Sequence, residues 1–88
     1  MAFNFEYTFV IKAPGGQAVS VEVFDVVGNL VWRKRLDAGA TTGADLYYNS
    51  PMRWDGRDTA GRDMANGVYT AVITVGTSRT IKKIVVAR

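Results

Sequence analysis

Hydrophobic and polar side chains alternate with a period of two along most of this chain. Large apolar residues alternate with polar ones over residues 5–12, and valines alternate with Ser20 and Glu22 over residues 19–23. No segment shows the 3.6-residue apolar spacing of an amphipathic helix. Because successive side chains of a strand point to opposite faces of a sheet, the pattern predicts half-buried strands in an all-β domain.

A third strand is predicted over residues 30–36, after a tight reversal at Gly28-Asn29. Its apolar face is expected to carry Leu30, Trp32 and Leu36. Its polar face is expected to carry Val31, Arg33 and Arg35. Lys34 falls on the apolar face, where we expect its aliphatic stem to pack while the amine stays in water. Trp32 is expected in the core.

The last third of the chain contains the clearest hairpin signal. Two runs rich in β-branched residues, 68–75 and 80–87, are joined by residues 76–79. These runs predict a pair of long antiparallel strands connected by a short turn.

The middle of the chain is less regular. Residues 37–44 and 55–67 are rich in turn-forming residues and predict loops. Residues 46–54 predict one more strand, which Pro51 places at a sheet edge or a bulge. Six or seven short strands, separated by turns roughly every 8 to 12 residues, are typical of an antiparallel β-sandwich.

Composition limits the chemistry that this chain can carry. Its 88 residues favour one domain over residues 1–88, and 48% hydrophobic with 22% charged residues indicates a globular fold. The chain contains no histidine and no cysteine, so it lacks an imidazole base, a thiolate ligand and a disulfide. No carboxylate pair can be assigned to acid–base roles. We therefore expect no enzyme activity and no cofactor.

Charge and hydropathy argue against two kinds of partner, nucleic acids and membranes. A net charge of +3 is well short of the dense basic stripe of a nucleic-acid binder. No apolar run approaches the roughly 20 residues needed to cross a bilayer. We do not expect Met1-Ala2-Phe3-Asn4 to begin a signal peptide, because no positively charged region precedes an apolar stretch there. We expect neither nucleic-acid binding nor membrane insertion.

Three segments carry a resemblance to a known family. Residues 21–31 contain the run Val-Phe-Asp-Val-Val-Gly, residues 54–69 run from Trp-Asp-Gly to Gly-Val-Tyr, and residues 80–88 form a basic and then apolar ending. In order and spacing these segments resemble the Ig-like domain of the flagellar hook-capping protein FlgD and related C-terminal domains of secreted bacterial proteins. The segment 37–53 is longer than in most members of that family, which leaves open the register of the strand that leads to Trp54.

The resemblance implies a fold and a role. The fold is an Ig-like or fibronectin-III-like antiparallel β-sandwich of about seven strands. The residues that match the family signature are Trp54, Asp55, Gly56, Gly61, Gly67 and Tyr69. The implied role is that of a spacer, an assembly contact or a C-terminal sorting and anchoring signal. This chain would then be a fragment of a larger extracellular, cell-surface or envelope-associated protein, with other domains of that protein or the secretion machinery as partners.

Two clusters suggest alternatives that involve ions or charge. Asp55, Asp58, Asp63 and Asn66 form a dense group of oxygen ligands, as a calcium site needs. Arg57 and Arg62 oppose a cation there, so turn-capping side chains are the preferred interpretation. The second cluster is basic and consists of Arg33, Lys34, Arg35, Arg79, Lys82 and Lys83. Strand alternation divides these charges between two faces, which favours solvation and edge protection over an anion-binding patch.

A third alternative is carbohydrate binding. Tyr47 and Tyr48 are consecutive, so both cannot face the core of one strand. An exposed ring at this position could stack on a sugar, as in β-sandwich carbohydrate-binding modules. This alternative stands beside the structural role until the position of the two rings is known.

Overall fold

The chain folds into β-strands and turns. The computed structural model describes residues 5–9, 11, 17–37 and 53–87. The strands of this part are β1 (Tyr7–Thr8), β2 (Val19–Phe24), β3 (Leu30–Leu36), β4 (Arg53–Trp54), β5 (Gly67–Val75) and β6 (Ser78–Val86). The expected all-β class is confirmed for the described residues, none of which lies in a helix. Among them there is accordingly no helix long and apolar enough to span a membrane.

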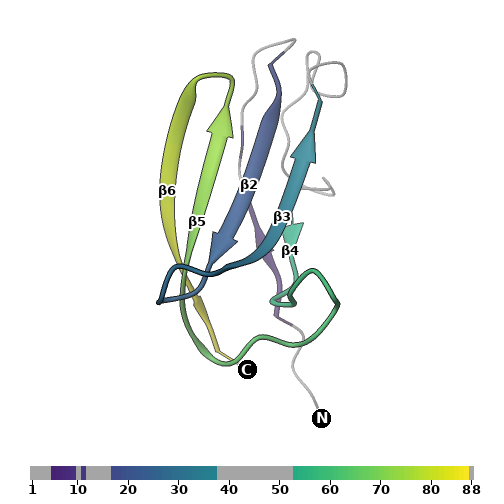
Figure 1. The fold of residues 1–88 in the computed structure, drawn as a ribbon, viewed down its shortest axis with the longest axis vertical. Coiled ribbons are helices and arrows are strands. Elements are labelled where there is room, and N and C mark those ends of the chain that lie inside the picture. The colour runs from purple at the N-terminus through teal and green to yellow at the C-terminus, as the bar shows by residue number, and fades with distance from the viewer. Residues whose placement is uncertain (1–4, 10, 12–16, 38–52, 88) are drawn as a thin grey trace.

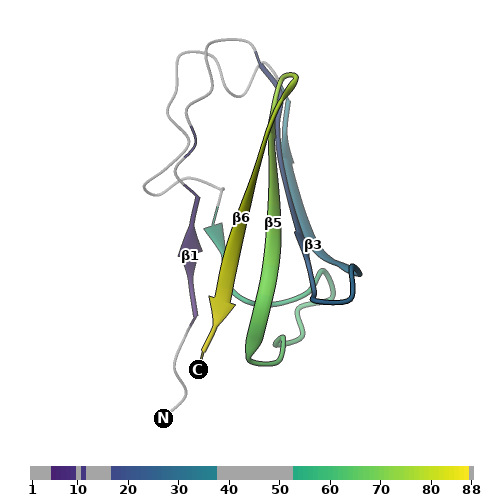
Figure 2. The same cartoon turned by 90° about the vertical axis from the view of Figure 1, so that its left-hand side faces the viewer.

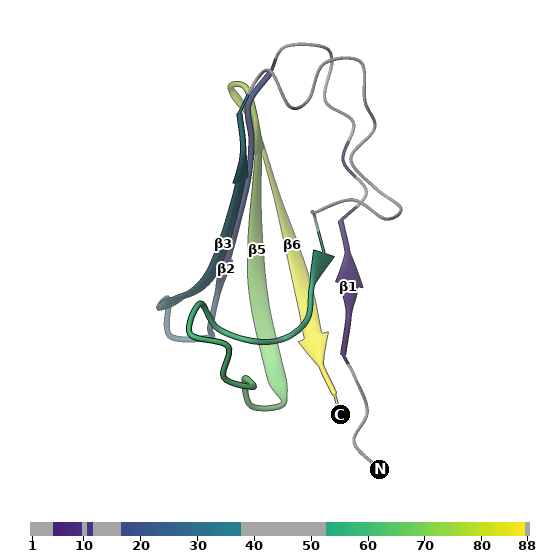
Figure 3. The same ribbon diagram turned by 90° about the vertical axis from the view of Figure 1, so that its right-hand side faces the viewer.

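The strands form two antiparallel sheets that face each other. A four-stranded sheet has the order β3-β2-β5-β6, and a two-stranded sheet pairs β1 with β4. The four-stranded sheet appears edge-on in Figures 2 and 3, with β1 and β4 on one side of it. We call the face turned toward β1 and β4 the inner face and the opposite one the outer face. Figure 1 looks onto the outer face.

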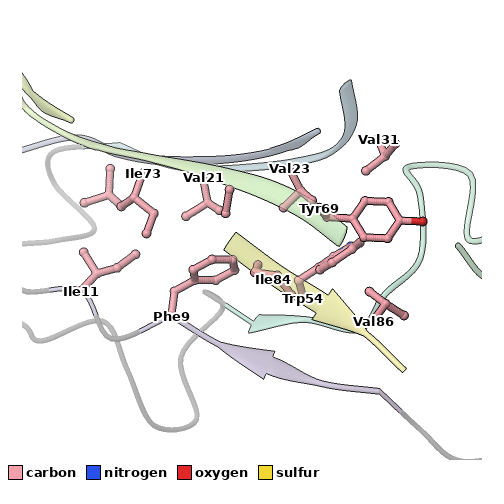
Figure 4. Close-up of a cluster of buried hydrophobic side chains, with 12 residues drawn as sticks. Phe9, Ile11, Val21, Val23, Val31, Trp54, Tyr69, Ile73, Ile84 and Val86 are labelled. Atoms are coloured by element: carbon pink, nitrogen blue, oxygen red, sulfur yellow. The ribbon is translucent and has the colours of Figure 1, made fainter. Parts of the chain in front are cut away.

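Alternation along the strands places the core between the sheets. In β2, Val19, Val21 and Val23 are buried, whereas the residues between them are half-buried on the outer face. From the facing layer, Phe9 and Ile11 point into the same cluster (Figure 4). The first strand was expected over residues 5–12, and its described pairing with β4 is confined to Tyr7–Thr8.

The predicted faces of β3 are wrong at its start. Val23 pairs with Trp32 and Phe24 pairs with Leu30, so Val31 is the extra residue of a β-bulge. The bulge turns Val31 into the core and leaves Leu30 exposed on the outer face, where simple alternation placed these two residues the other way round. Trp32 and Leu36 are half-buried against the core, as expected for that face.

The hairpin of β5 and β6 is confirmed, with a tighter turn than predicted. Nine residue pairs run from Gly67–Val86 to Val75–Ser78, so the connection is only Gly76-Thr77 instead of residues 76–79. Gly76 has a φ of 59°, which the primed turns of two-residue hairpins require. A Cβ at this position would also lie 2.8 Å from the Gln17 side chain.

The predicted strand over residues 46–54 is described only at its end, as β4. Residues 46–52, including Pro51, lie outside the described residues. The loop predicted over residues 55–67 is confirmed up to Gly67, which begins β5, and a single bridge between Arg57 and Asp63 draws it together.

Candidate functional site: the lower end and the outer face of the large sheet

Trp54 closes the lower end of the sandwich, where the chain leaves β4. Its side chain is 0% exposed and packs edge-on against Phe5 and Tyr69, with ring centroids 5.8 and 5.4 Å away. The indole Nε1 donates a hydrogen bond of 2.8 Å to the carbonyl oxygen of Arg57. Trp54 thus plugs this end of the core, as its place among the buried side chains of Figure 4 shows, and its indole N–H has a partner.

Tyr69 lies beside Trp54 at the start of β5 and ties the preceding loop to the core. Its ring is 5% exposed, and its hydroxyl donates a hydrogen bond of 2.7 Å to the carbonyl oxygen of Ala65, four residues upstream. In Figure 4 the hydroxyl of Tyr69 points away from the apolar cluster toward this loop. Tyr69 is therefore an inward-facing aromatic residue whose hydroxyl has a hydrogen-bond partner.

The loop between β2 and β3, residues 25–29, is organised by one carboxylate. Asp25 Oδ1 accepts hydrogen bonds from the backbone N–H groups of Val27 (3.1 Å) and Asn29 (2.8 Å). The Asp25 backbone N–H donates to the Asn29 carbonyl oxygen at 2.9 Å, which closes the loop. Gly28 follows with a φ of 93°, a conformation that glycine adopts without strain. The tight reversal predicted at Gly28-Asn29 is confirmed.

A second loop, residues 58–62, repeats this arrangement. Asp58 Oδ1 accepts from the N–H groups of Ala60 (3.0 Å) and Arg62 (2.9 Å), and the Asp58 N–H donates to the Arg62 carbonyl oxygen at 2.9 Å. Gly61 has a φ of 84°. Both loops therefore have the form Asp-x-x-Gly-x with the same hydrogen bonds. The sequence contained this signal, an aspartate three residues before a glycine at both places, but the repetition was not recognised.

The two loops are joined through the β-bulge. Thr59 donates two hydrogen bonds to the carbonyl oxygen of Val31, from its backbone N–H (3.0 Å) and from its hydroxyl (3.2 Å). A bulge removes one residue from the regular ladder, so the carbonyl of Val31 needs partners from elsewhere. The second loop supplies them and is thereby fixed against β3.

Both loop carboxylates are held in their charged form. Hydrogen bonds, above all from the Asn29 backbone N–H, hold the pKa of Asp25 below the ordinary aspartate value of 3.8. The pKa of Asp58 is also below 3.8, chiefly because of the Arg62 backbone N–H and then the Arg62 guanidinium, whose Nε donates to Asp58 Oδ2 at 2.9 Å. Desolvation raises the pKa at both positions, but by less than the hydrogen bonds lower it.

These shifts predict a loss of stability in acid. A carboxylate whose pKa is lower in the folded than in the unfolded state stabilises the fold above its unfolded pKa, and this contribution is lost as the pH falls through the folded pKa. Urea unfolding at pH 7 and near pH 3 should therefore show a smaller acid effect in Asp25→Asn/Asp58→Asn than in the unsubstituted chain. Asparagine keeps an accepting oxygen at each position but does not titrate. Equal acid effects in both proteins would contradict this role of the two carboxylates.

The residues considered for calcium have protein partners. Asp55 Oδ1 accepts from the Arg57 backbone N–H at 3.1 Å, and Asp63 Oδ1 accepts from Arg57 Nε at 3.1 Å. Asp58 is engaged by its own loop and by Arg62, and Asn66 immediately precedes β5. In the part of the chain that the structure describes, no three acidic, histidine or cysteine side chains are grouped as metal ligands. Calcium binding by these residues stays an untested alternative.

Two glycines of the family signature allow the tight turns at the lower end of the sandwich. Gly56 is buried, has a φ of 77°, and its carbonyl oxygen accepts a hydrogen bond of 2.8 Å from the Met64 N–H. Gly61 provides the turn of the second loop. Tyr47 and Tyr48, the aromatic residues considered for sugar binding, lie outside the described residues.

The outer face of the large sheet carries exposed hydrophobic side chains. Leu30, Val68, Ile81 and Val85 lie on it, because the register pairs them with outward residues of the neighbouring strands. At its lower end the β2–β3 loop projects outward from this face and presents Val26 (84% exposed) and Val27 (77% exposed) (Figures 1 and 2). We call these six residues the outer apolar surface. They are all of the large exposed hydrophobic residues in the described ranges.

Known proteins give limited guidance. No family model matches the chain. The chain is similar to C5a peptidases of Streptococcus pyogenes, among them those of serotypes M1 and M18, with 32% identity over 77 residues. The match covers 76% of this chain but only 6% of the relatives. The similarity therefore concerns a short segment of a much longer peptidase.

Proposed function

We propose that this chain is a non-catalytic interaction module of a larger exported bacterial protein, which contacts another domain of that protein through the outer apolar surface. The observation that carries the proposal is that Val26, Val27, Leu30, Val68, Ile81 and Val85, the large exposed hydrophobic residues of the described ranges, lie on the outer side of the domain. Exposed apolar residues are ordinary when they are scattered over a surface, whereas their concentration on one side of a domain favours a contact surface.

The similarity to the streptococcal peptidases supports a role as one part of a long chain. It involves 6% of those proteins, and the printed activity belongs to the whole of each of them. This chain has no histidine and no cysteine, and Asp25, Asp55, Asp58 and Asp63 serve as turn residues or ion-pair partners. A supporting module is thus favoured over a catalytic unit, and an extracellular or cell-surface location is part of the same proposal.

The finer fold assignment is also a proposal. An Ig-like or fibronectin-III-like sandwich is supported by Tyr69, whose hydroxyl bonds back to Ala65 in the manner of the tyrosine corner of Ig-like domains. The FlgD-type resemblance gains support from the fact that its signature residues Trp54, Gly56 and Gly61 have structural tasks at the lower end. In a spacer or assembly role, the outer apolar surface of this chain would supply the contact, and a sorting role would add recognition by the secretion machinery.

Two neighbouring substitutions on β6 test the proposal. Ile81 and Thr80 are both exposed, but Ile81 lies on the outer face and Thr80 on the inner face. In the isolated domain, Ile81→Glu and Thr80→Glu should each change the free energy of unfolding by no more than ~0.5 kcal/mol. In the natural full-length protein, Ile81→Glu should destabilise the domain by about 1–2 kcal/mol more than Thr80→Glu, because it places a charge in an apolar contact. Equal effects of the two substitutions in both settings would refute the proposed contact.

A further inference from the structure

A shallow groove crosses the upper half of the outer face. Its volume is about 300 Å³, and its polar lining comes from Ser20, Glu22, Arg33, Arg35 and Thr74. Ser20 and Glu22 lie on β2, the two arginines on β3, and Thr74 on β5. The groove thus spans three adjacent strands and is separate from the loops at the lower end.

The register places a row of matching groups across this part of the sheet. Arg35 pairs with Ser20, Ser20 with Thr74, and Thr74 with Arg79. Because paired residues of neighbouring strands share a face, the row presents two hydroxyl groups with an arginine at each end. Arg33 lies in the next outward position of β3, opposite Glu22.

Positive charge dominates this region. The outward side chains of the four strands include Arg33, Arg35, Arg79 and Lys83 against the single carboxylate of Glu22. Glu22 and Arg33 form a loose ion pair of 3.9 Å, which offsets one of these charges. Within the described part of the chain, Arg35 and Arg79 have no carboxylate partner. Strand alternation divides the basic side chains between the two faces, as predicted, but most of them lie on the outer face.

The backbone of the groove excludes one common mode of recognition, in which a peptide adds to the sheet as a further strand. β2 is paired on both sides, with β3 and β5, and β5 is paired with β2 and β6. Their N–H and C=O groups are used in the sheet, so a peptide cannot add to the floor of the groove by strand pairing. Recognition there has to use guanidinium and hydroxyl groups. This combination suits a ligand that carries both acidic groups and many hydroxyls.

We propose that the groove binds an acidic polysaccharide, through carboxylate or sulfate groups carried on its sugar units. The planar guanidinium of Arg35 offers paired donors that match such an oxyanion, with Arg33 beside it on β3 and Arg79 at the opposite end of the row. The hydroxyls of Ser20 and Thr74 lie between the arginines and bond to sugar hydroxyls. The residues of this site are not among the six of the outer apolar surface, although both lie on the outer face, so the two contacts can be tested separately.

Direct binding to the isolated domain tests the assignment. The probes are an oligogalacturonate for carboxylate, a heparin-derived oligosaccharide of equal length for sulfate, a neutral malto-oligosaccharide and poly-L-glutamate. Affinities are measured by calorimetry at fixed ionic strength, because exposed charges are screened by salt. The variant Arg33→Gln/Arg35→Gln is compared with Lys34→Gln/Lys82→Gln, which loses the same charge from exposed residues of the inner face.

At least one acidic oligosaccharide should bind, and its acid group identifies the preferred oxyanion. The arginine variant should bind it roughly tenfold or more weakly, as expected for the loss of charge-assisted hydrogen bonds, and the lysine variant within about twofold of the unsubstituted domain. The assignment is overturned by equal losses in the two variants, by poly-L-glutamate binding as tightly as the acidic sugars, or by no binding of either acidic oligosaccharide. Each of these outcomes leaves the proposed contact of the outer apolar surface intact.

Discussion

Replacing Trp54 with alanine should lower the free energy of unfolding by about 3–5 kcal/mol. The side chain is 0% exposed and bridges Phe5 of the small layer and Tyr69 of the large sheet. Its removal would leave a cavity between the layers and leave the Arg57 carbonyl oxygen without its indole donor. A domain of this size has a total stability of about 5 kcal/mol, so most of it would be lost.

Urea unfolding followed by circular dichroism measures this loss of stability. Two further variants show how much of it comes from the hydrogen bond and whether it is specific to Trp54. Trp54→Phe keeps an aromatic plug but loses the hydrogen bond to Arg57, so its stability should lie between those of the alanine variant and the unsubstituted chain. Trp32→Ala removes the half-buried tryptophan of edge strand β3 and should cost clearly less than Trp54→Ala. If Trp54→Ala melted like the unsubstituted chain, the described position of the plug would be wrong.

Tyr69 should show the second largest effect. Tyr69→Ala removes a ring that is 5% exposed and should cost about 3 kcal/mol. Tyr69→Phe keeps the ring and its edge contact with Trp54 but leaves the carbonyl oxygen of Ala65 without its hydroxyl donor. The loss of this single hydrogen bond should cost about 1 kcal/mol.

The same unfolding experiment separates the two contributions of Tyr69. The difference between the alanine and phenylalanine variants reports the packing of the ring, and the difference between phenylalanine and tyrosine reports the bond to Ala65. Combining Tyr69→Ala with Trp54→Phe tests whether the two rings are coupled. A phenylalanine variant as stable as the unsubstituted chain would show that the hydroxyl does not hold the loop.

The strands and the core were largely predictable from the sequence, because alternation is imposed by the geometry of a half-buried sheet. The valines of β2 and the long hairpin are examples. The faces of the first residues of β3 were not predictable from alternation, since a bulge shifts the pattern by one residue. The bulge turns Val31 toward the core and Leu30 toward the outer face. The bulge depends on Thr59, which is distant in sequence and supplies the hydrogen bonds that the Val31 carbonyl needs.

The candidate surfaces were harder to predict than the fold. Trp54 and Tyr69 stand out in the sequence because aromatic residues beside turn residues are local signals, and the structure places both in the core at the lower end of the sandwich. The outer apolar surface combines residues from β3, β5, β6 and the loop that ends at Asn29, and only the strand order brings them to one side. The row from Arg35 to Arg79 likewise depends on the register of four strands, which the sequence did not specify.

The structure suggests how a small domain keeps one face available for contacts. The two Asp-x-x-Gly loops use their own carboxylates and backbone groups, and Thr59 fixes the second loop to β3. Trp54 and Tyr69 then join this end to the core. Because these interactions lie within the domain, the outer face is left free for other molecules.

Carbene footprinting of the isolated domain and of the natural full-length protein would show whether another domain covers the outer apolar surface. Labelling of Val26, Val27, Ile81 and Val85, all strongly exposed in the domain, would be compared with labelling of Thr80 on the inner face. We expect these four residues to become protected in the full-length protein while the labelling of Thr80 is unchanged. Equal labelling of the four residues in both proteins would contradict the claim that this surface contacts another domain.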